Sequence, residues 1–195
     1  MAIKSVCVFC GSSQGAKPAY KQAASAMGEA LAKAEIGLVY GGGNVGLMGI
    51  IADATLAAGG EVTGVIPEAL VAKEIAHQGL TKLHIVNSMH QRKALMAELS
   101  DAFVALPGGY GTFEEFCEVL TWAQLGLHQK PCGLLNVDGY YDYLIALFTH
   151  AVAEEFIRPQ HYSLVLNEQE PTRLLELLNQ YQPLLIDKWI NRDQT

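Results

Sequence analysis

The amino-acid sequence predicts an α/β fold, a single-domain Rossmann-like parallel sheet with helices on both faces. Short apolar runs alternate with stretches of helical spacing, which is the order of a sheet wound by right-handed crossovers. The chain has 195 residues, of which 50% are hydrophobic and 17% charged, a composition that suits a sheet buried on both faces. This length supplies one sizeable core but not a second domain. We therefore expect one domain over residues 1–195, with a polar tail from about residue 188.

Seven short apolar runs are predicted to form the strands. They consist mainly of aliphatic and aromatic residues and lack the polar alternation of a half-exposed strand, as expected where helices cover both faces. The runs are Ser5–Phe9, Gly37–Tyr40, Val62–Ile66, Leu83–Val86, Ala102–Leu106, Cys132–Val137 and Ser163–Leu166.

Six stretches between these runs are predicted to be helices, because their apolar residues recur near the helical period. Pro18 suits the first turn of the earliest stretch, where a missing N–H costs no hydrogen bond. The stretches are Lys17–Ala34, Gly46–Ala58, Ser88–Leu99, Thr112–Leu127, Tyr140–Glu154 and Pro171–Tyr181. In such a sheet, ligands bind beyond the carboxyl ends of the strands, where the strand order reverses.

The charge balance excludes several classes of partner. The formal net charge is -7, from Lys+Arg 13 against Asp+Glu 20, which argues against nucleic-acid polymers and anionic membranes. The N-terminal segment leads directly into an apolar strand, and no apolar run reaches the length of a membrane span. We expect a cytoplasmic protein.

The cysteines Cys7, Cys10, Cys117 and Cys132 all lie in apolar segments, which favours reduced and buried thiols. Cys7 and Cys10 form a C-x-x-C pattern, but positions three apart on a strand face opposite sides of the sheet. We therefore expect that this pair neither shares a metal ion nor forms a disulfide.

Small or polar residues follow four of the predicted strands. Gly11-Ser12-Ser13 follows the first strand, Gly41–Gly49 the second, Asn87–Lys93 the fourth and Pro107–Glu115 the fifth. Because parallel strands end at one edge of the sheet, these segments predict a single ligand cleft.

The segment Pro107–Glu115 has the build of an anion-binding loop. Its glycines permit a tight turn and a close backbone approach, and the first N–H groups of the following helix point at the anion from the positive end of the helix dipole. A phosphate is the expected ligand. Glu115 is the unusual feature, because a carboxylate beside a phosphate is electrostatically unfavourable unless the chemistry requires it.

The same glutamate has a structural alternative. Thr112-x-x-Glu115 matches a capping box, in which the glutamate accepts the N–H of residue 112 and has no chemical part. The residues alone leave both interpretations open. The capping box leaves Glu114 unexplained and predicts nothing about Arg92.

The turn after the second predicted strand carries another phosphate-binding pattern. Gly41, Gly43 and Gly46 match G-x-G-x-x-G, and Glu68 lies just past the next strand, where an acid could bind a ribose. However, the pattern stands on the second strand–helix unit, and the rest of the chain has no room for a hydride-acceptor domain. We therefore do not expect an NAD-type cofactor, although the glycines fit both close packing and nucleotide binding.

Ser88-x-x-Gln91 matches a capping box that places Arg92 and Lys93 near the first turn of the next helix. The positive end of a helix disfavours each cation there by a few tenths of a kcal/mol, up to about 1 kcal/mol. A bound phosphate or a carboxylate such as Glu115 would compensate. The alternative is a surface arginine paired with an acid such as Glu98.

Several motifs carry a resemblance to a known family. They are Gly41–Gly49 (GGGNVGLMG), Met89–Lys93 (MHQRK), Ser100–Glu115 (SDAFVALPGGYGTFEE), Thr121–Gly126 and Gly133–Tyr141. In this order they resemble the LOG (LONELY GUY) family, whose members are cytokinin riboside 5'-monophosphate phosphoribohydrolases long mislabelled as lysine decarboxylases. The resemblance covers the chain from the first predicted strand to about Tyr143 and is looser afterwards.

The resemblance implies a hydrolase that splits the N-glycosidic bond of an adenosine-type 5'-monophosphate, N6-substituted or plain, into free base and ribose 5-phosphate. It implies no cofactor and no metal. It also implies a homodimer, with the helices after the Pro107–Glu115 loop near the interface. The preferred base, and whether the role is hormone activation or nucleotide salvage, stay open.

The resemblance assigns residues as well. Glu115 and Arg92 are implied as the catalytic residues, with the division of roles between them left open, and the phosphate-binding positions fall on Gly109, Gly111 and Thr112. Glu74 and Thr121 are assigned by their place in the pattern. The predicted substrate-binding residues are Ser12, Gly42, Gly43, Glu74, Arg92, Lys93, Gly108, Gly109, Tyr110, Gly111, Thr112, Phe113, Glu114, Glu115 and Thr121.

The expected chemistry gives these groups distinct tasks. Glycosidic cleavage passes through an oxocarbenium-like sugar, so a carboxylate near the ribose can stabilise charge, orient hydroxyls or activate water. Arg92 could serve the departing base, the phosphate or the orientation of Glu115. Two rival functions are a lysine decarboxylase with pyridoxal phosphate on Lys93, and a nucleotide sensor or carrier that binds AMP without turnover.

Overall fold

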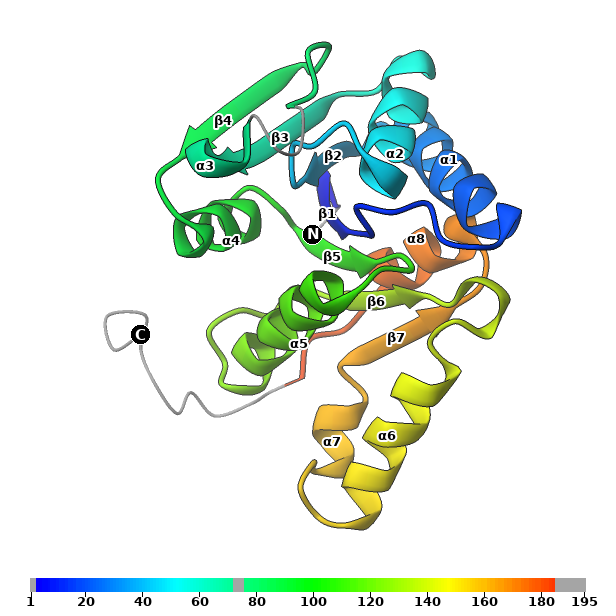
Figure 1. Cartoon of the computed structure of the whole chain (residues 1–195). Helices are drawn as coiled ribbons and strands as arrows, with labels where there is room; N and C mark the ends of the chain where they lie inside the picture. Colours follow the sequence, from blue (N-terminus) through cyan, green and yellow to red (C-terminus); the bar gives the residue numbers. More distant parts are fainter. Residues whose placement is uncertain (1–2, 72–75, 185–195) are drawn as a thin grey trace.

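Seven parallel strands form one sheet in the computed structural model of the chain, which describes residues 3–71 and 76–184 (Figure 1). The order across the sheet is β4-β3-β2-β1-β5-β6-β7. The strands are β1 (Ser5–Phe9), β2 (Gly37–Tyr40), β3 (Val62–Pro67), β4 (Lys82–Val86), β5 (Ala102–Ala105), β6 (Cys132–Leu135) and β7 (Val165–Glu168).

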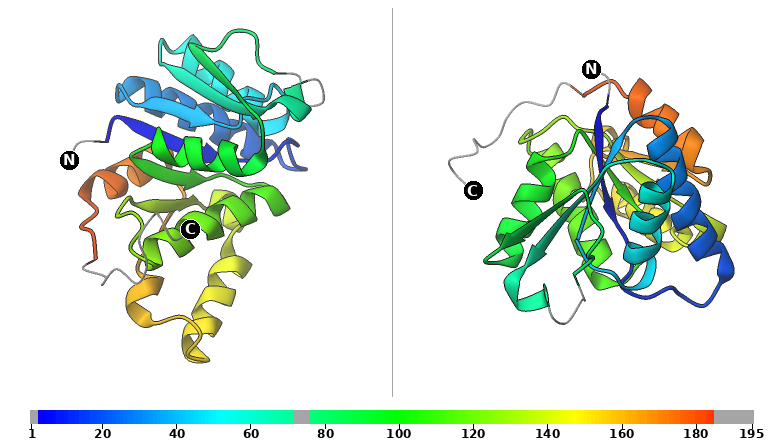
Figure 2. Two further views of the ribbon diagram at one scale, coloured as in Figure 1. Left: turned by 90° about the vertical axis from the view of Figure 1, so that its left-hand side faces the viewer. Right: turned by 90° about the horizontal axis from the view of Figure 1, so that it is seen from above.

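Helices cover both faces of this sheet (Figure 2), which confirms the predicted fold class. Helices α1, α2 and α8 pack on one face, and α4 and α5 pack on the other. The helices are α1 (Pro18–Lys33), α2 (Gly46–Ala57), α3 (Glu68–Val71), α4 (Met89–Glu98), α5 (Tyr110–Gln124), the 3-10 turn η1 (Val137–Gly139), α6 (Asp142–Ala153), α7 (Pro159–Tyr162) and α8 (Pro171–Gln180).

Strand β1 lies between two apolar cores, because successive side chains of a strand point to opposite faces. Val6 and Val8 pack with α1, α2 and α8, whereas Cys7 and Phe9 pack with α4 and α5. This double burial explains the unbroken apolar run in the sequence. Cys10, just after the strand, joins the first core, so Cys7 and Cys10 lie on opposite faces as predicted, and both are free thiols.

The predicted elements occur, with differences at their ends. Strands β1 and β2 have the predicted bounds, whereas the last strand lies at Val165–Glu168 instead of Ser163–Leu166. Helix α5 begins two residues earlier than predicted, at Tyr110. Strand β6 ends at Leu135, two residues early, because the chain turns into η1, where Asp138 has a φ of 51°. The short elements α3, η1 and α7 were not predicted.

The strand order reverses at β1, between β2 and β5. The loops after β1 and β5 leave the sheet side by side: the Gly11 N–H donates to Pro107 O at 3.0 Å, and the Leu106 N–H donates to Phe9 O at 2.9 Å. This is the place where open α/β sheets bind ligands.

Helices α6 and α7 extend away from the sheet (Figure 1). Helix α6 buries no residue within the chain. Tyr143 and Leu147 on this helix, and Phe156 after it, are exposed. Across the described residues, no helix is long and apolar enough to cross a membrane.

Candidate active site

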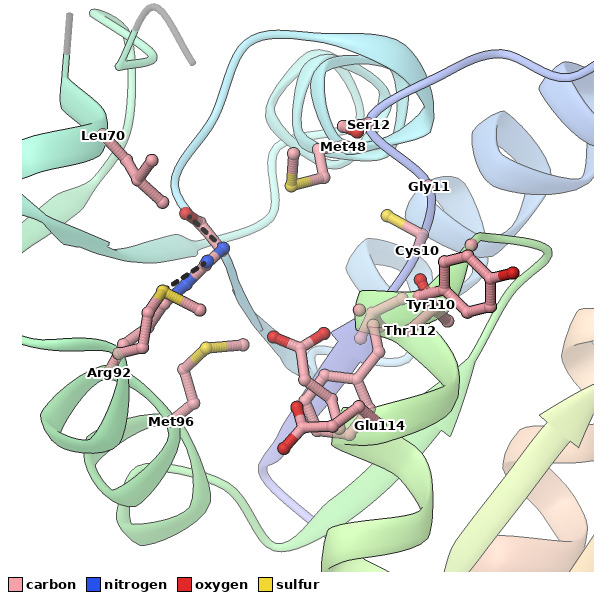
Figure 3. A pocket seen from close by; sticks show the side chains of 17 residues that line it. Cys10, Gly11, Ser12, Met48, Leu70, Arg92, Met96, Tyr110, Thr112 and Glu114 are labelled. Carbon is pink, nitrogen blue, oxygen red and sulfur yellow. Dashed lines mark hydrogen bonds between the residues drawn. The ribbon is translucent and has the colours of Figure 1, made fainter. Parts of the chain in front are cut away.

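A cleft of about 300 Å³ opens at the strand-order reversal (Figure 3). Its walls come from the loop after β1, the turn after β2, helix α4 and the start of helix α5. In Figure 3, Arg92 and Met96 stand on α4 across the cleft from Tyr110, Thr112 and Glu114 on α5. All four segments predicted to meet at one rim therefore contribute to the cleft, the Gly41–Gly49 segment through Gly41 and Met48.

The first turn of α5 forms one end of the cleft. Its N-cap is Gly109, which offers no side-chain cap, and the turn contains no acidic residue. The first N–H groups of a helix have no acceptor within it and carry the positive end of the dipole. A Cβ on Gly109 or Gly111 would meet nothing within 4 Å, so both glycines leave open space beside these N–H groups. The geometry is that of an anion site.

Gly108 joins this turn to the loop after β1. A Cβ there would lie 2.1 Å from Thr112 Oγ1 and 2.9 Å from the Gly11 backbone nitrogen. The close approach that brings the β1 and β5 loops together therefore requires glycine. The glycines of the turn after β2 act similarly: a Cβ on Gly46, which has a φ of +60°, would lie 2.2 Å from the Ser12 carbonyl carbon. Packing thus explains this part of the G-x-G-x-x-G pattern.

Arg92 is buried, with 6% of its surface exposed, and two backbone carbonyls hold its guanidinium. Nε donates to Val65 O at 3.1 Å, and Nη2 donates to Gly41 O at 3.0 Å. A Cβ on Gly41 would lie 1.9 Å from Nη2, so only glycine leaves room for this placement. Arg92 is thus fixed at the cleft wall, and the alternative of a surface arginine is wrong.

Helix α4 begins as predicted. The Gln91 N–H donates to Ser88 Oγ at 3.2 Å. The glutamine side chain reaches back to the Asn87 N–H at 2.9 Å rather than to that of Ser88. This cap fixes where the first turn starts, and Arg92 follows it directly.

Glu115 lines the cleft and does not cap its helix. Because α5 begins at Tyr110, Thr112 is the third helical residue and Glu115 lies in the second turn. The capping-box interpretation is therefore wrong. Burial raises the pKa of the Cys10 thiol, the charge of Glu115 raises it further, and the charge of Arg92 lowers it. Both charges thus act on a sulfur at the wall of the same cleft.

Lys93 turns away from the cleft toward helix α5. Its Nζ lies 2.6 Å from Glu114 Oε1 and 3.0 Å from Glu118 Oε1, and its side chain is 13% exposed. Burial lowers the pKa of Lys93, but the hydrogen bonds and charges of the two carboxylates outweigh this and raise it. Lys93 joins α4 to α5 and does not line the cleft, and the substrate contact predicted for it stays a prediction.

The cleft gathers about half of the predicted binding residues. Its lining includes Ser12, Arg92, Gly109, Tyr110, Gly111, Thr112, Glu114 and Glu115. Gly108 lines an adjoining pocket of about 290 Å³ with Tyr20 and Tyr140. Phe113 packs on the rings of Tyr140 and Tyr141 instead.

Other predicted residues lie elsewhere. Gly42 and Gly43 belong to the turn after β2 but do not line the cleft. The Thr121 hydroxyl donates to Cys117 O at 2.8 Å, and the residue lines a separate cavity of about 140 Å³. Glu74 lies outside the described residues. Glu68, the ribose-acid candidate of the dinucleotide alternative, is exposed at the start of α3.

An apolar wall was missed by the sequence reasoning. Met48, Met89 and Met96 line the cleft together with Leu70. Methionine is flexible and polarisable, and it adapts to ligands of varied shape. In sequence, methionines at helical spacing read as ordinary core residues, so no signal separated these from the rest.

Metal ligation has no support in the described part of the chain, residues 3–71 and 76–184, where no group of three or more His, Cys, Asp or Glu side chains could hold an ion. The single motif lysine, Lys93, is engaged by two carboxylates. The cleft therefore offers an anion site, a fixed guanidinium, carboxylates and an apolar wall.

Comparison with known proteins relates the sequence to a family. A family model described as "Possible lysine decarboxylase" matches residues 48–178. The chain is 58% identical over 164 residues to a cytokinin riboside 5'-monophosphate phosphoribohydrolase of Rhodococcoides fascians, covering 84% of this chain and 83% of that protein. It is 51% identical over 180 residues to the enzyme LOG7 of Arabidopsis thaliana, which carries the same description, covering 92% of this chain and 83% of that protein.

Solved structures share the fold at lower identity. A molybdenum cofactor binding protein from Rippkaea orientalis superimposes with a TM-score of 0.68 at 22% identity, covering 90% of this chain and 95% of that one. A molybdenum cofactor carrier protein from Chlamydomonas reinhardtii gives 0.69 at 20% identity, with 90% and 96% covered. These similarities confirm the Rossmann-like architecture.

Proposed function

Because the chain belongs to the LOG family, whose model carries the description "Possible lysine decarboxylase", we propose that it hydrolyses the N-glycosidic bond of adenosine-type nucleoside 5'-monophosphates. The products are the free base and ribose 5-phosphate. Cytokinin riboside 5'-monophosphates, which the names of the relatives specify, and plain AMP are the proposed substrates. We place the enzyme in the cytoplasm.

One observation carries the proposal: Arg92 and Glu115 line the same cleft as an uncapped helix N-terminus. A 5'-phosphate bound at the first turn of α5 would extend its ribose along that helix. Glu115 follows the first turn on the same helix, so its carboxylate would face the sugar. A simple phosphate site has no use for an acid in this position.

The reaction consumes one water. The bond between the base nitrogen and C1' breaks, the water oxygen bonds to C1', and a proton from the water ends on the departing base. Glu115 would stabilise the positive sugar and orient or deprotonate the water. Arg92 supplies a fixed positive charge where the base gains electron density or where the phosphate binds.

The apolar wall supports an adenine-type base. Met48, Met89, Met96 and Leu70 provide an adaptable surface beyond the charged pair. A flat purine can pack on thioether groups, and flexible side chains can accept an added N6 substituent. We therefore propose that both plain and N6-substituted adenine nucleotides enter this cleft.

We further propose that the active form is a homodimer. Tyr143, Leu147 and Phe156 expose large apolar side chains on and beside a helix that buries no residue within the chain. A second copy would cover such a surface. Gel filtration with light scattering would test this, and a monomer at micromolar concentration would contradict it.

Two rival functions fit the geometry less well. A lysine decarboxylase would need a lysine at the reacting centre, but Lys93 is held by Glu114 and Glu118. A nucleotide carrier would bind AMP without turnover, and it gains nothing from Glu115 in the cleft. The molybdenum cofactor binding and carrier proteins are 20–22% identical to this chain, a likeness that concerns the fold alone and supports no shared ligand.

The test is base release. Purified protein is incubated with AMP and with an N6-substituted adenosine monophosphate, and the free base is measured by chromatography. Glu115→Gln should abolish release while the melting temperature stays within about 2 °C, because a partly exposed carboxylate contributes little to stability. Glu98→Gln, at an exposed acid on α4 that does not line the cleft, is the control. AMP binding without base release would support the carrier.

A further inference from the structure

A histidine outside the cleft is bonded on both ring nitrogens. His77 is 8% exposed. Its Nε2 lies 2.9 Å from Asp53 Oδ1, and its Nδ1 accepts the Gly79 N–H at 3.1 Å. Because Nδ1 is an acceptor, the ring carries its proton on Nε2 and donates it to Asp53. The ring is therefore locked between helix α2 and its own segment.

The backbone of the same residue supports the turn after β2. The His77 N–H donates to Gly42 O at 3.1 Å, and Gly43 forms an antiparallel bridge with Ala76. Gly42 has a φ of +77°, a conformation that L-residues rarely adopt. The segment around His77 thus supplies external hydrogen bonds to a turn with an unusual backbone.

The turn after β2 also holds the guanidinium of Arg92, which comes from helix α4. The carbonyl of Gly41, one residue before Gly42, accepts from Arg92 Nη2 at 3.0 Å. A shift of the turn would move this acceptor and so break one of the two carbonyl hydrogen bonds, to Gly41 O and Val65 O, that orient the guanidinium. A continuous path of contacts therefore runs from Asp53 through His77 and the glycine turn to Arg92.

We propose that His77, oriented by Asp53, is a positioning residue that fixes the Gly41–Gly43 turn and, through it, the guanidinium of Arg92 at the cleft. Its kinetic consequence rests on the proposed hydrolase function, whereas the contacts do not. Neither His77 nor Asp53 lines the cleft. The Asp53 side chain is 68% exposed, so its truncation reaches the site through His77 and creates no buried cavity.

The kinetic test compares two substitutions of Asp53. Asp53→Ala removes the acceptor for Nε2–H and should lower kcat/KM for base release from AMP about tenfold, because small misplacements of reacting groups are costly. Asp53→Asn keeps an oxygen acceptor and should stay within about twofold of the wild type. Glu29→Ala, an exposed acid on α1, is the matched control. Equal activity of Asp53→Ala and the wild type would overturn the proposal.

A second readout does not depend on turnover. Amide hydrogen exchange is followed in peptides covering residues 41–46 and 76–80. Exchange should accelerate in both segments in Asp53→Ala and stay at the wild-type rate in Asp53→Asn, since the two segments share the His77–Gly42 bond. An inactive wild type with this exchange pattern would reject the hydrolase function but leave the positioning role of His77 standing. Unchanged exchange in Asp53→Ala would reject the positioning role of His77.

Discussion

Gly41→Ala isolates the contribution of the Arg92 position, because it adds one methyl group beside the guanidinium and leaves the charge intact. The added Cβ would lie 1.9 Å from Nη2, 3.1 Å from Cζ and 3.2 Å from Met48 Sδ. The guanidinium must retreat by about 1.5 Å to reach ordinary contact. Its bond to Gly41 O, 3.0 Å in the native arrangement, is then lost.

Two magnitudes follow from this displacement. A hydrogen bond from a charged donor is worth about 1.5–3 kcal/mol, and in a domain of this size each kcal/mol shifts the melting temperature by about 2–4 °C. Gly41→Ala should therefore melt about 3–12 °C below the wild type. A reacting group misplaced by about 1 Å costs about a hundredfold in rate, so kcat for base release should fall by about that factor.

The matched control is Gly37→Ala, at the other end of strand β2. A Cβ there has its nearest neighbour, Lys4 O, at 3.6 Å, an ordinary contact. Base release from AMP and thermal unfolding are measured for both variants. Gly41→Ala with kcat within twofold of the wild type, despite the lowered melting temperature, would show that the reaction does not depend on where Arg92 stands.

Three further predictions concern the cleft and its supports. Lys93→Met should lower the free energy of unfolding below about pH 10, because Glu114 and Glu118 raise the pKa of Lys93 in the folded protein. The difference from the wild type should shrink above about pH 10.4, since this stabilisation is lost as the amine deprotonates. Urea unfolding across this pH range checks the prediction, and a constant difference would contradict it. Gly108→Ala should raise KM for AMP and melt at a lower temperature than Gly109→Ala. A Cβ on Gly108 would lie 2.1 Å from Thr112 Oγ1, whereas a Cβ on Gly109 has no neighbour within 4 Å. Equal melting temperatures of the two variants would refute the packing argument. Adenosine should be cleaved at least about tenfold less efficiently than AMP, because the phosphate supplies binding energy used at the sugar; equal kcat/KM would place the phosphate away from α5.

The fold was readable from the sequence because its signals are local. The run Val6–Phe9 is apolar at every position, as expected for a strand that is buried on both faces. The errors occurred where a local signal was misleading. Thr112 looked like a helix cap, but α5 begins at Tyr110 after an uncapped glycine. An anion site needs such free N–H groups, so the missing cap supports the phosphate site that we propose at this turn.

The site was readable only in part, because neighbouring residues diverge. Arg92 and Lys93 are adjacent in sequence, yet the helix directs Arg92 to the cleft and Lys93 to the carboxylates of α5. Which of two adjacent cations meets the ligand depends on how α4 packs against α5, and a motif does not contain that information. The Asp53–His77 contact joins residues of different elements, and neither stood out in the sequence.

The different positions of Arg92 and Lys93 also determine how charge is balanced at the cleft. Glu114 and Glu118 share the charge of Lys93 at 2.6 and 3.0 Å. Besides Glu114, the cleft is lined by two charged residues of opposite sign, Arg92 and Glu115. An incoming phosphate would therefore meet the N–H groups of α5 rather than a lysine, and its repulsion from Glu115 would be offset by a guanidinium fixed on two carbonyls. Under the proposed hydrolase function, this guanidinium would allow the Glu115 carboxylate to lie next to the sugar while the phosphate is bound, which is where glycosidic cleavage needs a carboxylate.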